Sequence, residues 1–187
     1  MKNAIDYIYQ RRSIRKFNKK SVESEKINLL IKAAMAAPSA CNQQPWEFIV
    51  VSDKEVLNDL KSSLYSGNYN APLAIVVCGN MKLALSGPGK DYWIQDCSAA
   101  AENMLIAATD LNLGSVWIGV HPIASIIKPV KKILNIPEYV VPLGVIYIGY
   151  PEEEKKARTQ YNKKRVYKNK YDPDRKHRAR KKNLKYT

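Results

Sequence analysis

Cysteine and histidine are scarce in this sequence, which holds three cysteines and two histidines among 187 residues. Cys41, Cys78 and Cys97 are odd in number and form no CxxC pair, so they predict neither a disulfide framework nor a zinc site. His121 and His177 are too few and too far apart in the chain for a metal centre or a Ser-His-Asp set. Metal-dependent and serine-hydrolase chemistry are therefore disfavoured.

Long hydrophobic runs are also missing. The longest apolar stretch, Pro72 to Cys78, has the length of a strand and falls far short of the roughly 20 residues that span a membrane. The N-terminal stretch MKNAIDYIYQRR contains no apolar segment of signal-peptide length. We therefore expect a soluble, cytoplasmic protein with no membrane partner.

The common nucleotide and hydrolase motifs are absent as well. The sequence has no GxGxxG and no GxSxG motif. The stretch SGPGKD resembles a phosphate loop only superficially, because the GxxxxGK[ST] spacing is missing and Asp91 follows the lysine. Kinase-like and hydrolase functions are poor candidates on these grounds.

What the chain does have is an excess of positive charge, concentrated at one end. The formal net charge is +14, and residues 151–187 hold 15 lysines and arginines against 5 acidic residues. Such an arm can bind nucleic acid, lie over an acidic neighbour or stay solvated. The length suits one domain, with a body at residues 1–150 and a basic C-terminal arm at residues 151–187 that could dock on a second subunit.

Hydrophobic periodicity predicts helices and strands that alternate along the body. The expected helices span residues 3–11, 23–36, 53–63, 92–111 and 123–134, and the expected strands are Trp46–Val51, Leu73–Cys78, Ser115–Val120 and Val141–Gly149. Ser21 is expected to cap the second helix, Ser52–Asp53 the third, and Met35 belongs to the apolar face of the second. The unbroken apolar run of the second strand predicts burial on both faces. The order is typical of α/β or α+β proteins.

The stretch RRSIRKF, residues 11–17, places Arg11, Ser13 and Arg15 at alternating positions. An extended backbone would direct these three side chains to one side, where two guanidiniums and a hydroxyl could hold a phosphate or a polar ring. A second interpretation is a helix end whose arginines complement the helix dipole. Lys16 would point the other way and receives no function.

Two further segments are rich in groups that could contact a flat polar ligand. PSACNQQPWEF, residues 38–48, supplies a hydroxyl and several amides between two prolines, although a plain polar turn beside a core Trp46 would look the same. LGSVWIGVHP, residues 113–122, runs an apolar strand into Gly119, where a backbone can closely approach a ligand. An ordinary core strand is the alternative there.

Taken together, these segments resemble the nitroreductase family of flavoproteins. RRSIRKF is similar to its RRSxRxF signature, PSACNQQPWEFIVV to PSxxNxQPWxFxVV, and DCSAAAENMLIAATDLNLGSVWIG to its long helix followed by LGxxWIG. GYPEEEKKARTQY is similar to the GxP turn and late basic segment. The resemblance implies an α+β fold with a central, mainly antiparallel sheet flanked by helices. It also implies an intertwined homodimer with an extended C-terminal arm and two FMN sites at the subunit interface.

The resemblance also implies which residues of this chain contact the cofactor. It implies Arg11 and Ser13, with Arg12 beside them, at the FMN phosphate and ribityl chain, and Arg15 at the N1/C2=O edge of the flavin. The other implied contacts are Pro38, Ser39 and Asn42 from the partner chain, then Asn70, Trp117, Ile118, Gly119, Lys156 and Arg158, with Arg165 as a weaker candidate. No side chain is given a catalytic role, because the chemistry would occur at flavin N5 beside the backbone of Ile118 and Gly119.

The implied activity is hydride transfer from NADH or NADPH through flavin N5 to nitroaromatic, quinone or similar acceptors in a ping-pong cycle. Two alternatives stay open: a flavin protein with another reductive role, such as dehalogenation or flavin transformation, and a basic nucleic-acid-binding module that uses KHRARKKNLKY. The sequence decides neither between the two nucleotides nor between a redox role and a filler role for Cys41.

Overall fold

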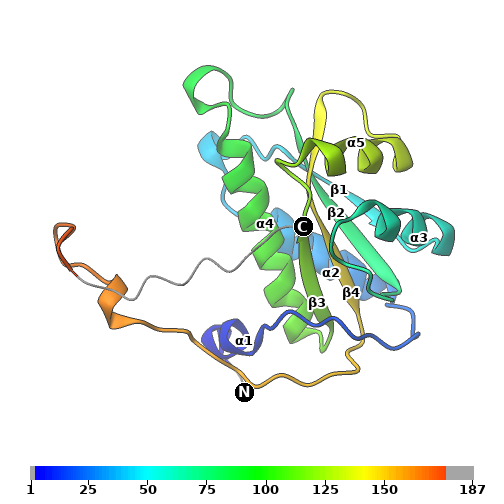
Figure 1. The fold of residues 1–187 in the computed structure, drawn as a ribbon, viewed down its shortest axis with the longest axis horizontal. Helices are drawn as coiled ribbons and strands as arrows, with labels where there is room; N and C mark the ends of the chain where they lie inside the picture. Colours follow the sequence, from blue (N-terminus) through cyan, green and yellow to red (C-terminus); the bar gives the residue numbers. More distant parts are fainter. Residues whose placement is uncertain (1–2, 176–187) are drawn as a thin grey trace. The chain divides into compact units, whose positions relative to one another are not determined.

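The chain folds around a four-stranded antiparallel sheet (Figure 1). The computed structural model describes residues 3–175 and divides the chain into two units, residues 1–157 and residues 158–187. The sheet belongs to the first unit. Its strands are β1 (Trp46–Val51), β2 (Leu73–Asn80), β3 (Gly114–Gly119) and β4 (Val140–Gly149), in the order β1-β2-β4-β3. Each neighbouring pair is antiparallel, so β1 and β3 are the edge strands.

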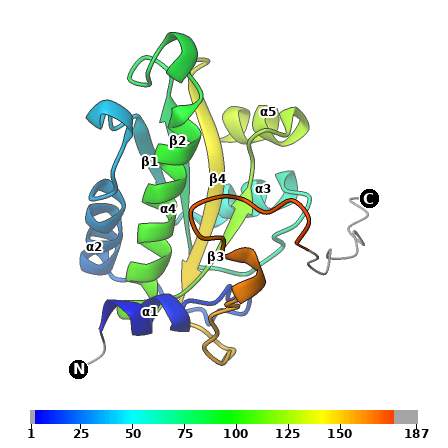
Figure 2. The same cartoon turned by 90° about the vertical axis from the view of Figure 1, so that its left-hand side faces the viewer.

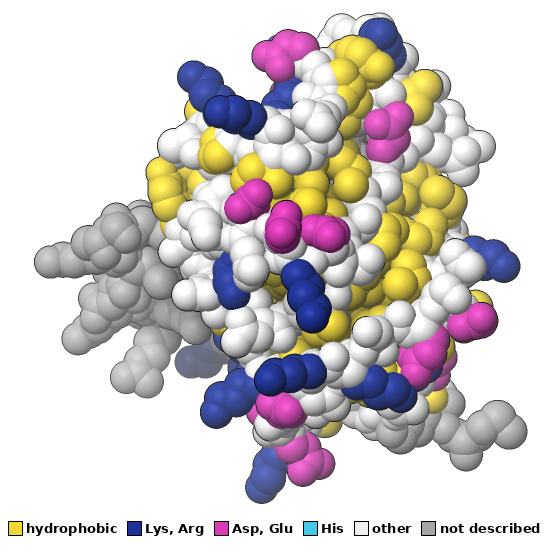
Figure 3. All heavy atoms as spheres, turned by 90° about the vertical axis from the view of Figure 1, so that its right-hand side faces the viewer, with side chains coloured by type: hydrophobic (Ala, Val, Ile, Leu, Met, Phe, Trp, Pro, Cys, Tyr) yellow, Lys and Arg dark blue, Asp and Glu magenta, His cyan; other side chains and the backbone are white. Residues whose placement is uncertain are grey.

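Helices cover both faces of this sheet (Figure 2). They are α1 (Ala4–Gln10), α2 (Ser24–Met35), α3 (Lys54–Ser63), α4 (Tyr92–Asp110) and α5 (Ala124–Ile133), with short 3-10 helices η1 (Ala40–Asn42) and η2 (Gly87–Gly89). The helices α2 and α4 share one hydrophobic cluster with the sheet, and α3 and α5 share the other. Figure 3 views the face that carries α3 and α5, where apolar and charged side chains lie side by side.

The central strand β2 explains why both faces need cover. All eight of its residues are buried, and successive side chains point to opposite faces of the sheet. Ile75 and Val77 join the cluster beneath α4, whereas Val76 and Cys78 join the cluster beneath α3 and α5. The predicted two-sided burial of this strand is confirmed.

The predicted elements agree with the structure to within one or two residues at most ends, and the α+β class is confirmed. The Asp53 cap is also confirmed, because its carboxylate accepts from the backbone N–H groups of Glu55 and Val56. The predicted Ser21 cap is wrong: α2 begins after Glu23, which makes no side-chain cap bond. Met35 was expected on the apolar face of α2 but is 49% exposed, whereas its neighbour Ala34 is buried.

The second unit is described by itself over residues 158–175. It contains the 3-10 helix η3 (Lys163–Arg165) and a pair of tyrosine rings, Tyr167 and Tyr171, with centroids 4.5 Å apart. The Arg175 guanidinium lies 4.4 Å from the centroid of the Tyr167 ring. The basic run from residue 176 onward, including His177, lies outside the described residues. No helix formed by residues 3–175 combines the length and the apolar character that a bilayer crossing requires.

Candidate functional site

The outer edge of β3 is where the predicted segments meet. The backbone N–H of Ile14 donates to the carbonyl of Ser115 at 2.9 Å, and Ser13 pairs with Ser115 in a parallel bridge. The segment RRSIRKF therefore runs beside the edge of β3 that does not contact β4. Local sequence does not reveal this pairing, since about 100 residues separate the two segments.

Beyond Ser115 this edge of β3 carries further backbone groups. Main-chain groups alternate between the two edges of an antiparallel strand, so Trp117 and Gly119 face the same outer edge as Ser115. Gly119 is exposed, and a Cβ added there would meet nothing within 4 Å. The main-chain groups of Ile118 face the other edge of the strand, where Ile118 pairs with Val145 of β4, and its side chain is buried. The outer edge thus offers two peptide units, at Trp117 and Gly119, to a ligand.

Two apolar side chains anchor the basic segment against the body. Ile14 and Phe17 are both buried, and Phe17 pairs with Pro151 in an isolated antiparallel bridge. Ile14 fills the space above Gly114, where an added Cβ would come within 2.7 Å of its Cγ2 atom. The bridges at Ser13 and Phe17 show an extended backbone over this part of RRSIRKF, whereas Arg11 is the C-cap of α1, as the helix-end interpretation had it. With the apolar residues turned inward, the polar residues between them remain at the surface.

Each of the three arginines of the segment has a defined partner. Arg11 Nε lies 3.2 Å from Glu102 Oε1 on α4, and the Arg12 guanidinium donates to the carbonyl of Lys156. Arg15 Nε donates to the Tyr69 hydroxyl at 3.1 Å. These partners come from α4, from the chain after β4 and from the chain before β2, so three distant parts of the sequence orient the cations.

The chain after β4 lies along the basic segment and adds more charge. Lys155 Nζ donates to the carbonyl of Ser13 at 2.6 Å and to Glu153 Oε1 at 3.0 Å. Glu153 Oε1 also accepts from the backbone N–H of Arg15 at 2.5 Å. That backbone hydrogen bond, followed by the one from Lys155, holds the pKa of the Glu153 carboxyl below its ordinary value. Sequence reasoning missed Lys155 and Glu153, although both lie in the quoted EEEKK stretch beside Lys156.

The structure thus brings together seven of the predicted cofactor contacts at or beside the outer edge of β3, namely Arg11, Arg12, Ser13, Arg15, Trp117, Gly119 and Lys156. Asn70 follows Tyr69 in the chain, and its Oδ1 accepts from Lys61 Nζ at 3.0 Å. Arg158 and Arg165 belong to the second unit, so their place at this site stays a prediction.

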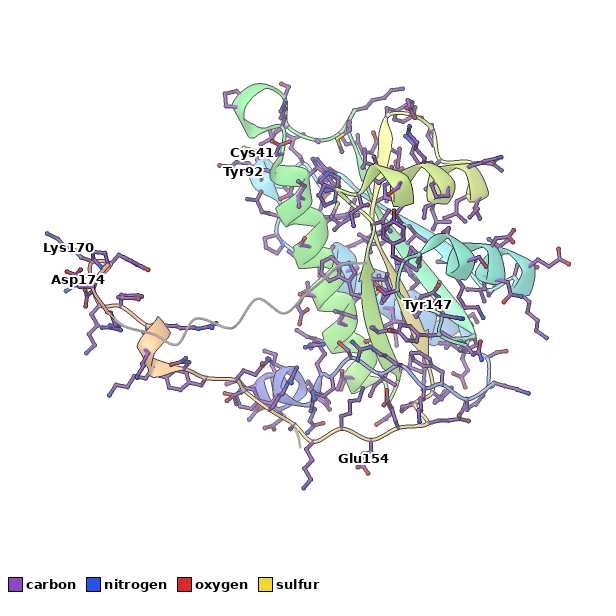
Figure 4. The ribbon with its side chains drawn as sticks, viewed as in Figure 1. Cys41, Tyr92, Tyr147, Glu154, Lys170 and Asp174 are labelled. Atoms are coloured by element: carbon purple, nitrogen blue, oxygen red, sulfur yellow. The ribbon has the colours of Figure 1, made fainter. Side chains whose placement is uncertain are left out.

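The loop that holds Pro38, Ser39 and Asn42 does not lie beside RRSIRKF in the folded chain. The backbone N–H of Ala40 donates to Oδ1 of the buried Asp96 at 2.9 Å, which fixes the loop to the first half of α4. Asp96 precedes Glu102, the partner of Arg11, by six residues, which is roughly 9 Å along the helix and about a third of a turn around it. Figure 4 shows Cys41 and Tyr92 at one end of the first unit and Glu154 at the other. Within a single chain, this loop and the segment RRSIRKF therefore do not form one site.

The backbone of this loop is unusual. Three residues that are not glycine, Cys41, Asn42 and Gln44, have positive φ angles of 49°, 56° and 49°. The Ser39 hydroxyl accepts from the backbone N–H of Gln44 at 3.0 Å and closes the turn. Left-handed conformations of such residues cost free energy and cluster at ligand and interface sites.

Comparison with known proteins identifies the class. The profile of the Nitroreductase family matches residues 8–72 and 63–150. A candidate NADH dehydrogenase/NAD(P)H nitroreductase of Archaeoglobus fulgidus is 44% identical over 176 residues, which cover 91% of this chain and 100% of that protein. FMN reductase (NADPH) of Bacillus subtilis is 29% identical, over 89% of this chain and 73% of that protein. A solved FMN-dependent nitroreductase of Clostridium difficile R20291 is 37% identical, with a TM-score of 0.82 over 89% of this chain and 99% of that one.

These matches define an α+β oxidoreductase of the nitroreductase type. The chain belongs to the nitroreductase family, which confirms the recognition made from the four motifs.

Proposed function

We propose that this protein is an FMN-dependent NAD(P)H oxidoreductase that acts as a homodimer, with two flavin sites that each draw on both chains. The observation that carries the proposal is the pairing of RRSIRKF with the outer edge of β3, which places a row of cations beside open backbone groups. Family membership and the names of the relatives support the reaction class and the cofactor.

The cations suit the phosphate of FMN. Arg11, Arg12 and Lys156 lie on adjoining stretches of chain, and the carbonyl of Lys156 accepts from Arg12. Charge-assisted hydrogen bonds to a phosphate contribute about 1.5–3 kcal/mol each, so three of them can retain FMN without a covalent link. The Arg11–Glu102 ion pair is partly exposed and worth only about 0–1 kcal/mol, so Arg11 can exchange Glu102 for a phosphate at little cost.

The ring system would lie along the outer edge of β3. Gly119 leaves space for a flat ring to approach the backbone, and the outward N–H groups at Trp117 and Gly119 can donate to ring heteroatoms. Arg15, oriented by the Tyr69 hydroxyl, would place its positive charge at the N1/C2=O edge. A cation there stabilises negative charge on the reduced ring and favours two-electron transfer.

When bound, the flavin would accept a hydride at N5 from NADH or NADPH and pass electrons to a nitroaromatic, a quinone or a similar acceptor in a ping-pong cycle. The role of the protein's own residues would be to bind and orient the cofactor. Its own residues hold the phosphate, fix the ring edge and leave the face over Gly119 open, and no side chain of this site needs to move a proton.

A second copy of the chain would complete the site. The helix α1 buries none of its residues, and Ile5, Ile8 and Tyr9 are 55%, 49% and 41% exposed. An amphipathic helix with an uncovered apolar side is expected to pack against something, and a second copy fits the separation between Pro38–Asn42 and RRSIRKF. In such a dimer Pro38, Ser39 and Asn42 would reach the partner's flavin, and the arm from residue 151 would extend onto the partner.

The test begins with the purified, full-length protein. We expect a yellow protein with flavin absorbance, release of FMN on denaturation and the elution volume of a dimer. Anaerobic addition of NADH and NADPH in separate experiments should bleach the flavin band, and a nitroaromatic or a quinone should restore it. A colourless protein that cannot be reconstituted with FMN, and that binds nucleic acid with a steep salt dependence, would overturn the proposal.

A further inference from the structure

The loop between α3 and β2 lies against the strand whose outer edge was assigned to the flavin ring. Its two ends are anchored in the core by Leu64 and Ala71, which are both 8% exposed. Gly67 in the loop has a φ of +117°, and a Cβ added there would come within 3.1 Å of Cγ1 of Ile118 in β3. The loop is therefore held close to β3, and its position is set by packing.

Packing and hydrogen bonding together fix the position of Tyr69 within this loop. Its backbone N–H donates to the carbonyl of Gly67 at 2.7 Å. Its ring packs edge-on against Tyr147 of β4, with ring centroids 6.1 Å apart and an interplanar angle of 89°. Tyr147 is only 1% exposed, so the half-buried Tyr69 ring rests on a fully buried neighbour. The hydroxyl at the end of this ring consequently occupies a defined place.

The Tyr69 hydroxyl orients the side chain of Arg15. It accepts a hydrogen bond from Arg15 Nε at 3.1 Å, and Arg15 Nη1 lies 3.5 Å from the carbonyl of Ser13. An exposed arginine otherwise samples many rotamers, and a ligand that fixes it must overcome the lost side-chain entropy. Because Tyr69 already supplies this order, the guanidinium is preorganised for a ligand.

The partner of Arg15 is neutral, in contrast to the partner of Arg11. Arg11 Nε lies 3.2 Å from the carboxylate of Glu102, which opposes its charge. Among residues 3–175, the Arg15 side chain forms no ion pair with a carboxylate. Glu153 bonds the backbone N–H of Arg15, and its carboxylate pairs with Lys155. A phenol hydroxyl carries no net charge, so Tyr69 orients the guanidinium and leaves its positive charge available.

We propose that Tyr69 is a positioning residue that raises the two-electron reduction potential of bound FMN by holding Arg15 in place. The inference rests on the proposed function, in which Arg15 meets the N1/C2=O edge of the ring. Hydride transfer from NADH or NADPH adds two electrons and one proton at N5, so the nicotinamide is oxidised and the ring gains one negative charge. A fixed cation at the ring edge stabilises that charge, whereas it stabilises the neutral oxidised ring much less.

The consequence is a difference in affinity between the two redox states. A held cation strengthens the binding of reduced FMN relative to oxidised FMN, and the ratio of these affinities sets the shift in potential from that of free FMN. For a two-electron couple, a tenfold change in this ratio corresponds to about 30 mV. Tyr69 would act through Arg15, so its effect should be absent when Arg15 is absent.

The experiment measures the reduction potential of the FMN-saturated, full-length protein. The protein is reduced slowly under anaerobic conditions together with a reference dye of known potential, and both absorbance spectra are followed to equilibrium. The affinity for oxidised FMN is measured separately by fluorescence quenching. Neither measurement depends on whether the protein reduces a particular acceptor.

Two tyrosines of the same loop provide a matched pair of variants. Tyr69→Phe keeps the ring that packs on Tyr147 but removes the acceptor for Arg15. It should lower the affinity ratio about tenfold, which is about 30 mV, and change the affinity for oxidised FMN less than about threefold. Tyr65→Phe removes the same atom from a residue that is 73% exposed and bonds Ser125 of α5. This control should change the ratio less than about twofold.

A double-mutant cycle tests whether Tyr69 acts through Arg15. Arg15→Ala alone should lower the ratio about tenfold or more, because the cation itself is lost. Adding Tyr69→Phe to Arg15→Ala should change the ratio less than about twofold further, since no guanidinium remains to be oriented.

Three outcomes would overturn the inference while leaving the proposed function intact. They are an unchanged potential in Tyr69→Phe, an equal shift in Tyr65→Phe, and a full further shift when Tyr69→Phe is added to Arg15→Ala. A Tyr69→Phe protein that loses the same affinity for oxidised and reduced FMN falls under the first outcome and would show a purely structural role. A parent protein that does not bind FMN would overturn both the inference and the proposed function, and this is seen before any variant is made.

Discussion

Two loops of this molecule were predicted to hold the same cofactor, and they differ in almost every structural respect. RRSIRKF is extended, anchored by two buried side chains and bonded to three distant parts of the chain. The loop of residues 38–44 is tightly turned, with three left-handed residues, and is fixed to a different part of α4. The first loop is held by its pairing with the edge of β3, whereas the second is held by the Ser39 hydroxyl and by the bond from Ala40 to Asp96, at the cost of three left-handed residues.

The largest expected effect comes from the first loop. Arg11→Ala should weaken FMN binding about 10- to 100-fold, because a charge-assisted bond to the phosphate is lost. The measurement is FMN affinity from fluorescence quenching on reconstitution. Lys16→Ala is the matched control, since it removes the same charge from the same segment at an exposed position. Equal affinities for the two variants would remove Arg11 from the phosphate site.

The second prediction asks whether the two loops act across the dimer. In a heterodimer of an Arg11→Ala chain and a Ser39→Ala/Asn42→Ala chain, one site would contain both defects and the other would contain neither. We expect each variant homodimer to retain little FMN and the mixed dimer to recover about one FMN per two chains. Differently tagged chains, co-expressed and purified through both tags, allow the flavin to be counted.

If both loops served a site within one chain, every site of the mixed dimer would carry one defect and no recovery would occur. That outcome would leave the family assignment intact and refute the shared site.

Local signals in the sequence predicted most of the fold. The unbroken apolar run before Cys78 identified a strand buried on both faces, and Asp53 marked the start of α3 through its own side chain. Ser21 failed as a cap because the direction in which the chain enters a helix decides which residue caps it, and that direction depends on packing. Local sequence contains no information about packing between distant segments.

Packing between distant segments also explains which residues of the candidate site could be predicted and which could not. Arg11 and Lys156 were found because they lie in motifs with recognisable spacing. Glu153, Lys155 and Tyr69 were missed because their roles arise only when the chain after β4 and the chain before β2 come to lie beside RRSIRKF.

A smaller effect should reveal the strain in the second loop. Gln44→Gly removes the steric cost of a positive φ, whereas Gln43→Gly acts where the backbone is already right-handed, with φ of −70°. Since glycine also raises the entropy of the unfolded chain, the first change should be neutral or stabilising and the second destabilising, with a difference of about 1–2 kcal/mol between them. Urea unfolding at one fixed protein concentration measures this difference in the free energy of unfolding. Equal stabilities would mean that the loop is not strained.

The smallest expected effect concerns the carboxylate that braces the first loop. Because the pKa of Glu153 is lower in the folded protein than its ordinary value of 4.5, the folded state binds fewer protons at this group than the unfolded state does. Its contribution to stability is therefore complete above about pH 4.5 and is lost as the pH falls through the folded pKa. Glu153→Gln keeps an acceptor for the Arg15 N–H but removes the charge that pairs with Lys155. Melting curves should show the variant slightly less stable than the parent at pH 6 and converging with it as the pH falls through the lowered folded pKa of Glu153. The exposed Glu154→Gln is the control, and a parallel loss in both variants at pH 6 would show that general charge, rather than the bond to Arg15, is responsible.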